Sequence, residues 1–403
     1  MNFRKWLIIS FFNLLIVATI GFLLRYKIAF SLPFINQKFL LHAHSHFAFT
    51  GWISQTIMVL MIARLGELFK SNLFKKYRYL LWGNLVTAFG MLLTFSFQGY
   101  GLWSISFSTL SIFVSFAFAI IYWRDLNLIK EKQISKSWFK MAFFCNAISS
   151  LGAFALAYMM ANKIINQNWH LAAEYFFLHF QYNGWFFFTC MGLICSKFLE
   201  NKLSFSNLHI HFKLFAIAVI PAFFLSTLWM KLPTWLYIIV VFSAFLQVIA
   251  WIYLINKVYK IKIFSFLNKR IANLIITLSA VAFTIKILLQ LGSTIPSLST
   301  LAFGFRPIVI GYLHLVLLGV ISLSLIGYVL SLEYNKHYKL LNNGALFFAI
   351  SVIINEILLM VQGVTALKYI AIPYINILLL FAAFLLFASA MIIVIGLNKS
   401  KLI

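Results

Sequence analysis

Acidic residues, cysteine and proline are all scarce in this chain of 403 residues. Asp and Glu together number 7 against 32 Lys and Arg, and charged residues make up only 10% of the sequence. This shortage excludes a soluble globular domain, because the surface of such a domain needs far more charge. The 3 cysteines form no CxxC pair, which excludes a disulfide framework and leaves Cys145, Cys190 and Cys195 as small core residues.

Long apolar runs dominate what is present. Hydrophobic residues make up 63% of the chain, and its mean hydropathy is +0.98. Runs of about 18 or more apolar residues are typical of membrane-spanning helices, whereas a barrel would show alternating polarity. The sequence therefore predicts an all-α polytopic membrane protein, with a single transmembrane domain over residues 1–403 and about twelve spans. The expected spans are 6–24, 39–63, 78–97, 103–123, 138–161, 171–195, 213–230, 234–256, 272–291, 308–332, 344–363 and 372–396.

The positive charge is distributed unevenly between the two sides of the expected membrane domain. Of the 32 Lys and Arg, 24 fall in the termini and alternate loops, 7 fall on the other side, and Lys286 lies within a span. Under the positive-inside rule this asymmetry places both termini in the cytoplasm of a bacterial inner membrane. The net charge of +25 is then a topology signal and an attraction to anionic membrane lipid, and it argues against a nucleic-acid partner.

Histidines gather near the outer side of three expected spans. They are His42, His44 and His46 in the second span, His170 and His179 in the sixth, and His314 in the tenth. With a rise of about 1.5 Å per residue, three helices place imidazoles at a similar depth, roughly 10–12 Å below their outer ends. Because imidazole is costly in hydrocarbon without a partner, this shared layer predicts a metal or haem site.

Helical spacing separates these side chains into faces. His42 and His46 share one face of their helix, whereas His44 points elsewhere. In the sixth span His170 and Glu174 share a face. A carboxylate inside the membrane has to be protonated, paired or bound to a metal, and the alternative is that Glu174 lies in water and pairs with His170.

Other polar groups near the outer side complete the candidate site. Tyr312 and His314 lie two residues apart and so point to different sides of the tenth span. Arg306 is placed either to pair with an anionic group such as a haem propionate or to serve as an ordinary interfacial arginine. Lys286 is expected to extend outward to the water layer. Three further histidines are expected in cytoplasmic loops: His209, His211 and His337.

The histidine pattern resembles subunit I of the haem–copper oxidase and nitric oxide reductase superfamily, and also the NnrS-like twelve-helix haem proteins. The resemblance is carried by HSHFAFTGW in the second span and by Tyr312-Leu313-His314, with Gly319 after it, in the tenth. It implies an oxidase-like bundle in which a b-type haem is held between His314 and either His44 or His46. Tyr312 then stands where the family has the ligand of its second haem.

The same resemblance places His179, followed by Tyr182, at the helix 6 ligand of a copper or iron centre. His170 and His42 are the further candidate metal ligands, and Tyr182 and Glu174 the candidate catalytic residues. The seventh span, KLFAIAVIPAFFLSTLWM, lacks the family's histidine pair, so matching residues do not complete a binuclear centre. The implied function is electron transfer or an oxidoreductase reaction with O2 or NO in a respiratory chain. The implied partners are a cytochrome c or quinol electron donor and small partner subunits.

Other classes of protein fit the same spans. A secondary transporter also has twelve helices and would use ionisable groups such as Lys286 and Glu356, although its helix breaks would need more than the 6 prolines present. A membrane enzyme of another kind, acting on lipid or haem, is a further alternative. A sensor or assembly protein without catalytic activity is the last.

Overall fold

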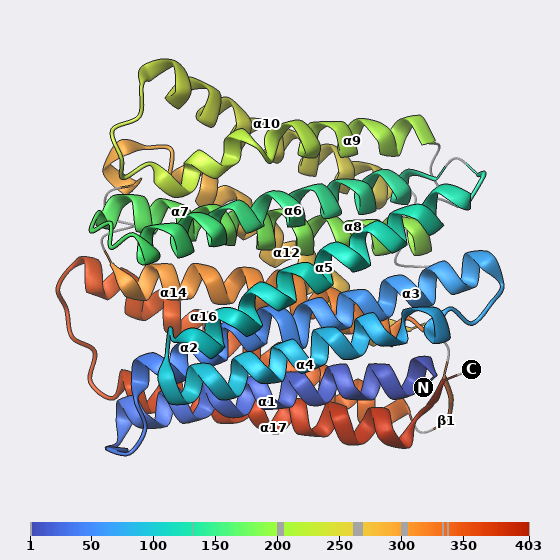
Figure 1. Cartoon of the computed structure of the whole chain (residues 1–403), viewed down its shortest axis with the longest axis horizontal. Coiled ribbons are helices and arrows are strands. Elements are labelled where there is room, and N and C mark those ends of the chain that lie inside the picture. Colours follow the sequence, from blue (N-terminus) through green and yellow to red (C-terminus); the bar gives the residue numbers. More distant parts are fainter. Residues whose placement is uncertain are drawn as a thin grey trace.

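Long helices lie side by side along the longest axis of the molecule in the computed structural model of the chain (Figure 1). This arrangement leaves backbone polar groups bonded within each helix, as hydrocarbon requires. The structure describes residues 2–131, 133–199, 205–260, 269–299, 305–332, 334–336 and 338–402.

Ten helices in these described ranges are long and apolar enough to cross a membrane. Eight of them are single α-helices: α1 (Phe3–Ala29), α4 (Phe74–Gln98), α5 (Leu102–Leu128), α6 (Ile134–Ala161), α10 (Thr234–Lys260), α12 (Arg270–Gly292), α16 (Tyr338–Leu367) and α17 (Ile375–Lys399). The other two each contain a π-helical segment between two α-helices. They are α2 (Gln37–Phe47), η1 (Ala48–Ser54) and α3 (Gln55–Phe69), and then α14 (Arg306–His314), η5 (Leu315–Ser322) and α15 (Leu323–Leu330).

The predicted sixth and seventh spans are helical but less regular. The seventh consists of α9 (Phe205–Ala218) and the 3₁₀-helix η4 (Pro221–Thr227), bent by 46° where Pro221 removes a backbone donor. Counting this bent pair as one span raises the total in the described ranges from ten to eleven. The sixth is a continuous helical segment. Its polar residues lower its mean hydropathy, so it is not among the ten helices counted above. It comprises α7 (Gln167–His179), η2 (Phe180–Phe186), α8 (Phe187–Ile194) and η3 (Cys195–Leu199).

Both chain termini lie at the same end of the bundle (Figure 1). There Arg4 donates a hydrogen bond to the carbonyl oxygen of Asn398. The short strand β1 (Tyr334–Lys336) pairs antiparallel with β2 (Lys401–Leu402) at the same end. The termini therefore share one side of the bundle, and the assignment of that side to the cytoplasm stays a prediction.

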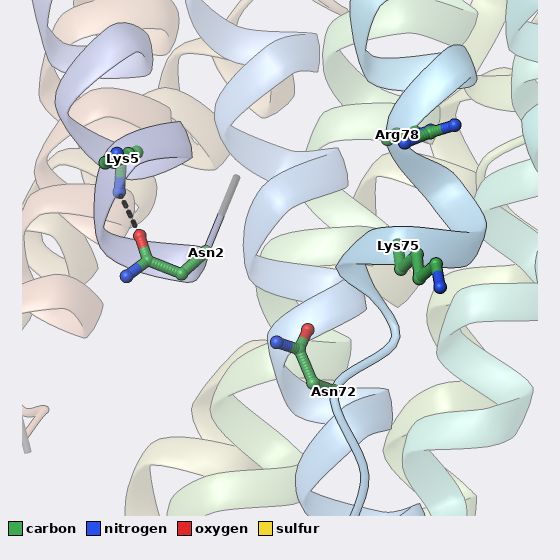
Figure 2. A pocket seen from close by; sticks show the side chains of 5 residues that line it. All are labelled: Asn2, Lys5, Asn72, Lys75 and Arg78. Atoms are coloured by element: carbon green, nitrogen blue, oxygen red, sulfur yellow. Dashed lines mark hydrogen bonds between the residues drawn. The ribbon is translucent and has the colours of Figure 1, made fainter.

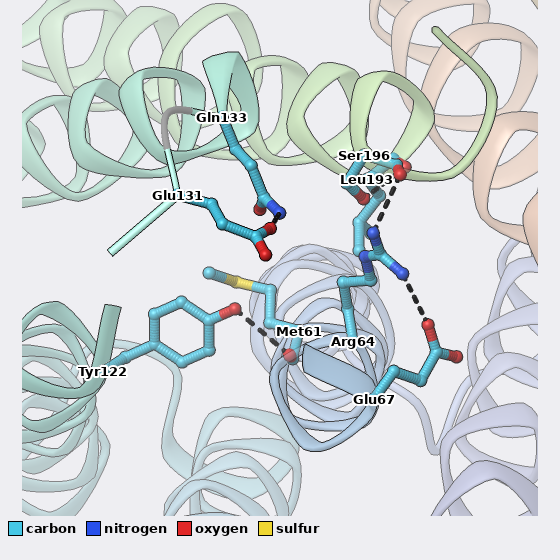
Figure 3. A network of polar contacts seen from close by, with 8 residues as sticks. All are labelled: Met61, Arg64, Glu67, Tyr122, Glu131, Gln133, Leu193 and Ser196. Carbon is cyan, nitrogen blue, oxygen red and sulfur yellow. Dashed lines mark hydrogen bonds and ion pairs between the residues drawn. The ribbon is translucent and has the colours of Figure 1, made fainter. Parts of the chain in front are cut away.

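Burial separates central helices from lipid-facing ones. In the span Gln37–Phe69, 78% of the most apolar stretch is buried, against 17% in α5. Polar contacts connect the last turns of α3, at the end of the bundle that carries the chain termini, to its neighbours (Figure 3). Arg64 donates to Glu67 at 2.7 Å and to the carbonyl oxygen of Ser196 at 2.9 Å, and the Tyr122 hydroxyl donates to the Met61 carbonyl oxygen at 3.1 Å. The span Gln37–Phe69, which carries His42, His44 and His46, therefore lies at the centre of the bundle.

Two glycines allow α16 and α17 to approach each other closely. A Cβ atom added at Gly396 would lie 2.6 Å from the backbone nitrogen of Leu341, and one added at Gly344 would lie 2.9 Å from that of Ile393. Neither backbone atom can move without shifting a helix. This contact has the small-residue character that drives helix association in membranes.

We expect Gly396→Ala to destabilise the protein by about 1–3 kcal/mol, because the added methyl group overlaps the α16 backbone. Thermal unfolding of purified protein would show a lower Tm. The control is Gly292→Ala, because a Cβ atom there meets nothing within 4 Å. An unchanged Tm for Gly396→Ala would contradict the close packing of α16 and α17.

Candidate functional site

Each of the three predicted spans with outer histidines becomes π-helical within two residues of a histidine. The segment η1 begins at Ala48, two residues after His46. The segments η2 and η5 begin immediately after His179 and His314. π-Helical turns inside α-helices are frequent at functional sites, so this local geometry points to the same part of the three spans as the histidines do. A further π-helical segment, η3, follows no histidine.

A glycine follows the histidine at the same distance in all three spans. The pairs are His46 with Gly51, His179 with Gly184, and His314 with Gly319. Two of these glycines pack against other helices: a Cβ atom at Gly184 would lie 2.4 Å from Cβ of Cys145, and one at Gly319 would lie 3.1 Å from Cβ of Ala282. This recurring spacing went unnoticed in the sequence, where the histidines and glycines were considered span by span.

His44 and His314 come from different spans and are close enough to interact electrostatically. Nδ1 of His314 is hydrogen-bonded to the Ile310 carbonyl oxygen at 2.8 Å, so its other ring nitrogen, Nε2, faces outward from that bond. On His44, Nδ1 is buried and has no hydrogen-bond partner among the described residues. Gly21 of α1 leaves room for this ring, because a Cβ atom there would lie 3.2 Å from Cε1 of His44.

The hydrogen bonding of these two imidazoles is compatible with a metal-containing group, such as haem, that has two histidine ligands. A ligating histidine needs one ring nitrogen for the metal and a partner for the other, commonly a backbone carbonyl. His314 has this arrangement, and His44 has a buried nitrogen with no hydrogen bond. Both residues keep part of their surface exposed, because His44 is half-buried and no residue of α14 is fully buried.

Arg25 is a functional candidate that the sequence analysis missed. It lies near the end of α1, is half-buried, and interacts electrostatically with His314. By contrast, Arg306 is exposed at the first residue of α14. The sequence analysis counted Arg25 only as one cation of the outer loops. Its place within the last two turns of an apolar span was the signal that could have found it.

The other face of α2 carries His42 and His46, as their spacing predicts. The His46 ring stacks on Phe95 with centroids 4.2 Å apart, and its Nε2 lies 3.3 Å from the Tyr100 hydroxyl. The His42 ring meets the edge of the Tyr100 ring at 4.7 Å. Burial, and secondarily the Glu174 carboxylate, raises the pKa of Tyr100 to about 12, so this hydroxyl keeps its proton at neutral pH. His42 and His46 thus have aromatic neighbours, on a different side from His44.

His179 belongs to a second polar cluster. Its Nε2 donates to the Val219 carbonyl oxygen at 2.8 Å, and Nδ1 accepts from the Asn183 side chain at 3.1 Å. Together with Lys286 and Gln247, these side chains line a cavity of about 10 Å³, roughly the space of one water molecule. Lys286 is only 3% exposed, so the expectation that it extends outward to water is wrong. Packing of α12 against α10 and η5 points it inward instead.

The structure does not bring the three candidate metal ligands together. Nε2 of His170 is bonded to the Ile164 carbonyl oxygen at 2.8 Å, while His42 lies beside Tyr100. His170 and His179 are separated by about 13 Å of helix rise. Among the residues that the structure describes, no group of three or more His, Cys, Asp or Glu side chains could hold a metal ion.

The candidate catalytic residues also lie apart. Glu174 is exposed on α7 and forms no ion pair with His170. Tyr182 is buried in η2, where its ring meets that of Tyr312 edge-on with centroids 6.3 Å apart. Tyr182 therefore contacts the tenth predicted span through Tyr312, and it does not form a pair with Glu174.

Two of the histidines expected in loops are helical. His209 and His211 lie in α9, and His211 is buried, with its ring 4.7 Å from that of Tyr253. The expectation of solvent exposure is wrong for His211 because α9 begins earlier than the apolar run and packs on α10. His337 lies outside the described residues.

Comparison of the chain with protein-family models finds no match. No curated protein matches it in sequence either. Membership of the haem–copper oxidase superfamily is therefore a proposal, and it depends on the arrangement of the histidines.

We expect Lys286→Met to raise the Tm, because an amine buried in the membrane interior costs free energy that a methionine of similar length does not. Thermal unfolding in one detergent would measure the change. Lys231→Met is the matched control at an exposed lysine, where little change is expected. A lower Tm for Lys286→Met would mean that the cavity stabilises the amine and would contradict this expectation.

Proposed function

We propose that this chain is a multi-pass membrane haem protein in which His44 and His314 hold one b-type haem for electron transfer. The observation that carries the proposal is the approach of these two imidazoles from separate spans. Support comes also from the Ile310 carbonyl, which holds the proton of His314 on Nδ1 and orients the ring. A bis-histidine haem supplies one-electron redox chemistry, with a potential set by its ligands, hydrogen bonds and burial.

Charged and aromatic side chains around the pair support the same role. Arg25 lies where it can bind an anionic substituent such as a propionate, and Arg306 offers a second cation at the exposed start of α14. Tyr312, two residues before His314, packs on Tyr182 and fills the space on the opposite side of α14. These residues would bind and orient the group and keep water away from the two rings.

Electron transfer fits better than reduction of O2 or NO at a binuclear centre. Both ring nitrogens of His179 are engaged, and the candidate ligands His170 and His42 lie elsewhere. The proposed setting is a bacterial inner membrane, with a cytochrome c or a quinol as the electron donor and with small partner subunits. Relationship to the haem–copper oxidase superfamily, with its twelve-helix bundle, is part of this proposal.

A secondary transporter is the second candidate function. The observation that favours it is the buried amine of Lys286 in a polar cavity, together with Glu356 in α16, which accepts a hydrogen bond from Asn355 at 3.1 Å. Ionisable groups inside membrane helices are typical of ion and substrate pathways. Protein that stays colourless after haem-replete expression, yet moves a solute into vesicles, would favour this function.

A reduced-minus-oxidised optical spectrum tests the haem directly. We expect the purified chain to show a low-spin b-type α band, and we expect His44→Ala and His314→Ala each to abolish it, because each removes one axial ligand. His46→Ala and His170→Ala are matched controls that should keep the band. Loss of the band in His46→Ala with retention in His44→Ala would contradict the choice of His44, and a colourless wild-type protein would contradict the proposed function.

Arg25→Gln should lower the midpoint potential of the bound haem, because removal of a nearby positive charge makes the reduced form less favourable. A decrease of roughly 40 mV is expected, the one-electron equivalent of about 1 kcal/mol. A spectroscopic redox titration measures it, and Arg25→Lys, which keeps the charge, is the control. An unchanged potential in Arg25→Gln would place Arg25 away from the haem.

A further inference from the structure

An open surface cavity of about 400 Å³, whose lining residues are all exposed, lies at the end of the bundle that carries the chain termini, between the first turns of α1 and α4. Its lining residues are Asn2, Lys5, Asn72, Lys75 and Arg78 (Figure 2). Three of these five side chains are cations and none is acidic. The cavity is large enough for a phosphate group and its substituents, and it is unrelated to the histidine layer.

The positive charge of this cavity is not neutralised by the protein. Nearby carboxylates have other partners, since Glu67 pairs with Arg64 and Asp125 pairs with Lys76. Across the part of the chain that the structure describes, no ion pair involves Lys5, Lys75 or Arg78. Three cations without an ion pair raise the positive potential at the cavity, and this potential attracts an anion.

Backbone geometry adds to the attraction for an anion. The first turns of two helices meet at the cavity, and helix N-termini carry partial positive charge and free N–H groups. Asn2 and Asn72 use their side-chain oxygens to accept from the backbone nitrogens of Lys5 at 3.2 Å and Phe74 at 3.1 Å. Their amide NH2 groups remain as further donors.

Aromatic residues place this cavity at the level of the lipid headgroups. On α4, Tyr79 is 70% exposed and Trp82 is 47% exposed, one turn further along the helix. Exposed Tyr and Trp near helix ends are typical of the membrane–water interface. The Arg78 guanidinium lies over the Tyr79 ring at 4.4 Å, so the cation is held at that level.

We propose that this cavity binds the phosphate of an anionic phospholipid headgroup at the membrane surface on the side of the chain termini. Basic pockets between transmembrane helices are typical sites for such headgroups. Phosphate is the shared chemistry, so a free phosphate ion is the other source that an experiment has to distinguish. This site is independent of the proposed haem function, because no residue belongs to both.

Lipid binding to the full-length purified chain tests the proposal. The probes are short-chain phosphatidylglycerol and short-chain phosphatidylcholine, measured by native mass spectrometry, with inorganic phosphate as competitor. The test variant combines Lys5→Gln, Lys75→Gln and Arg78→Gln. The matched control combines three exposed basic residues of the same end that lie outside the cavity: Lys130→Gln, Lys260→Gln and Lys399→Gln.

We expect the wild-type chain and the control to bind phosphatidylglycerol in preference to phosphatidylcholine. The test variant should lose this preference, with binding about 5-fold weaker per cation and roughly 100-fold weaker overall. The single variant Lys75→Gln should show the 5-fold loss if the triple variant folds poorly. Competition by millimolar phosphate would identify the phosphate itself as the group that is bound, and binding without competition would identify the intact headgroup.

Two results would overturn the proposal. Equal losses in the test variant and the control would mean that diffuse surface charge, and not this cavity, attracts the lipid. No preference for phosphatidylglycerol in the wild-type chain would show that the cavity holds no anionic headgroup. The haem spectrum should stay the same in every variant, which separates this proposal from the proposed function.

Discussion

Hydrocarbon provides no partner for a polar group, and this single constraint explains most of the structure. It forces the backbone into helices and requires each buried polar side chain to find its partner inside the bundle. His179 meets it with the Val219 carbonyl and Asn183, and His46 meets it with Tyr100. His314 meets it at only one nitrogen, through Ile310, and His44 keeps a buried nitrogen with no bond. The buried nitrogen of His44 is therefore one of several exceptions to the constraint among the described residues, and Nε2 of His42 is another.

The three predicted spans with outer histidines share one local motif, but the histidine has different neighbours in each span. Each has a histidine, a π-helical segment and a glycine at the same spacing. In the tenth predicted span the histidine interacts electrostatically with His44, whereas in the sixth it lines a small polar cavity with Lys286. The neighbours that each ring meets, rather than the motif, decide between a ligand and a structural side chain.

Much of the fold followed from the sequence, because hydropathy is a property of neighbouring residues. The expected spans 39–63 and 308–332 overlap the observed helices Gln37–Phe69 and Arg306–Leu330 almost fully. Helical periodicity also placed His42 and His46 on one face. Predictions failed where the outcome depended on packing between distant segments: Lys286 points into the bundle, and His211 lies buried against Tyr253.

By itself the sequence determined where helices form and that both termini share one side, and it predicted that imidazoles lie in one layer. Each of these depends on residues within one span or on a count of charges in loops. Only the tertiary structure decided which imidazole of α2 interacts with His314, and that Arg25 rather than Arg306 interacts with it. The physical reason is rotation: turning a helix about its axis leaves hydropathy unchanged but exchanges every contact, and packing against distant helices sets that rotation.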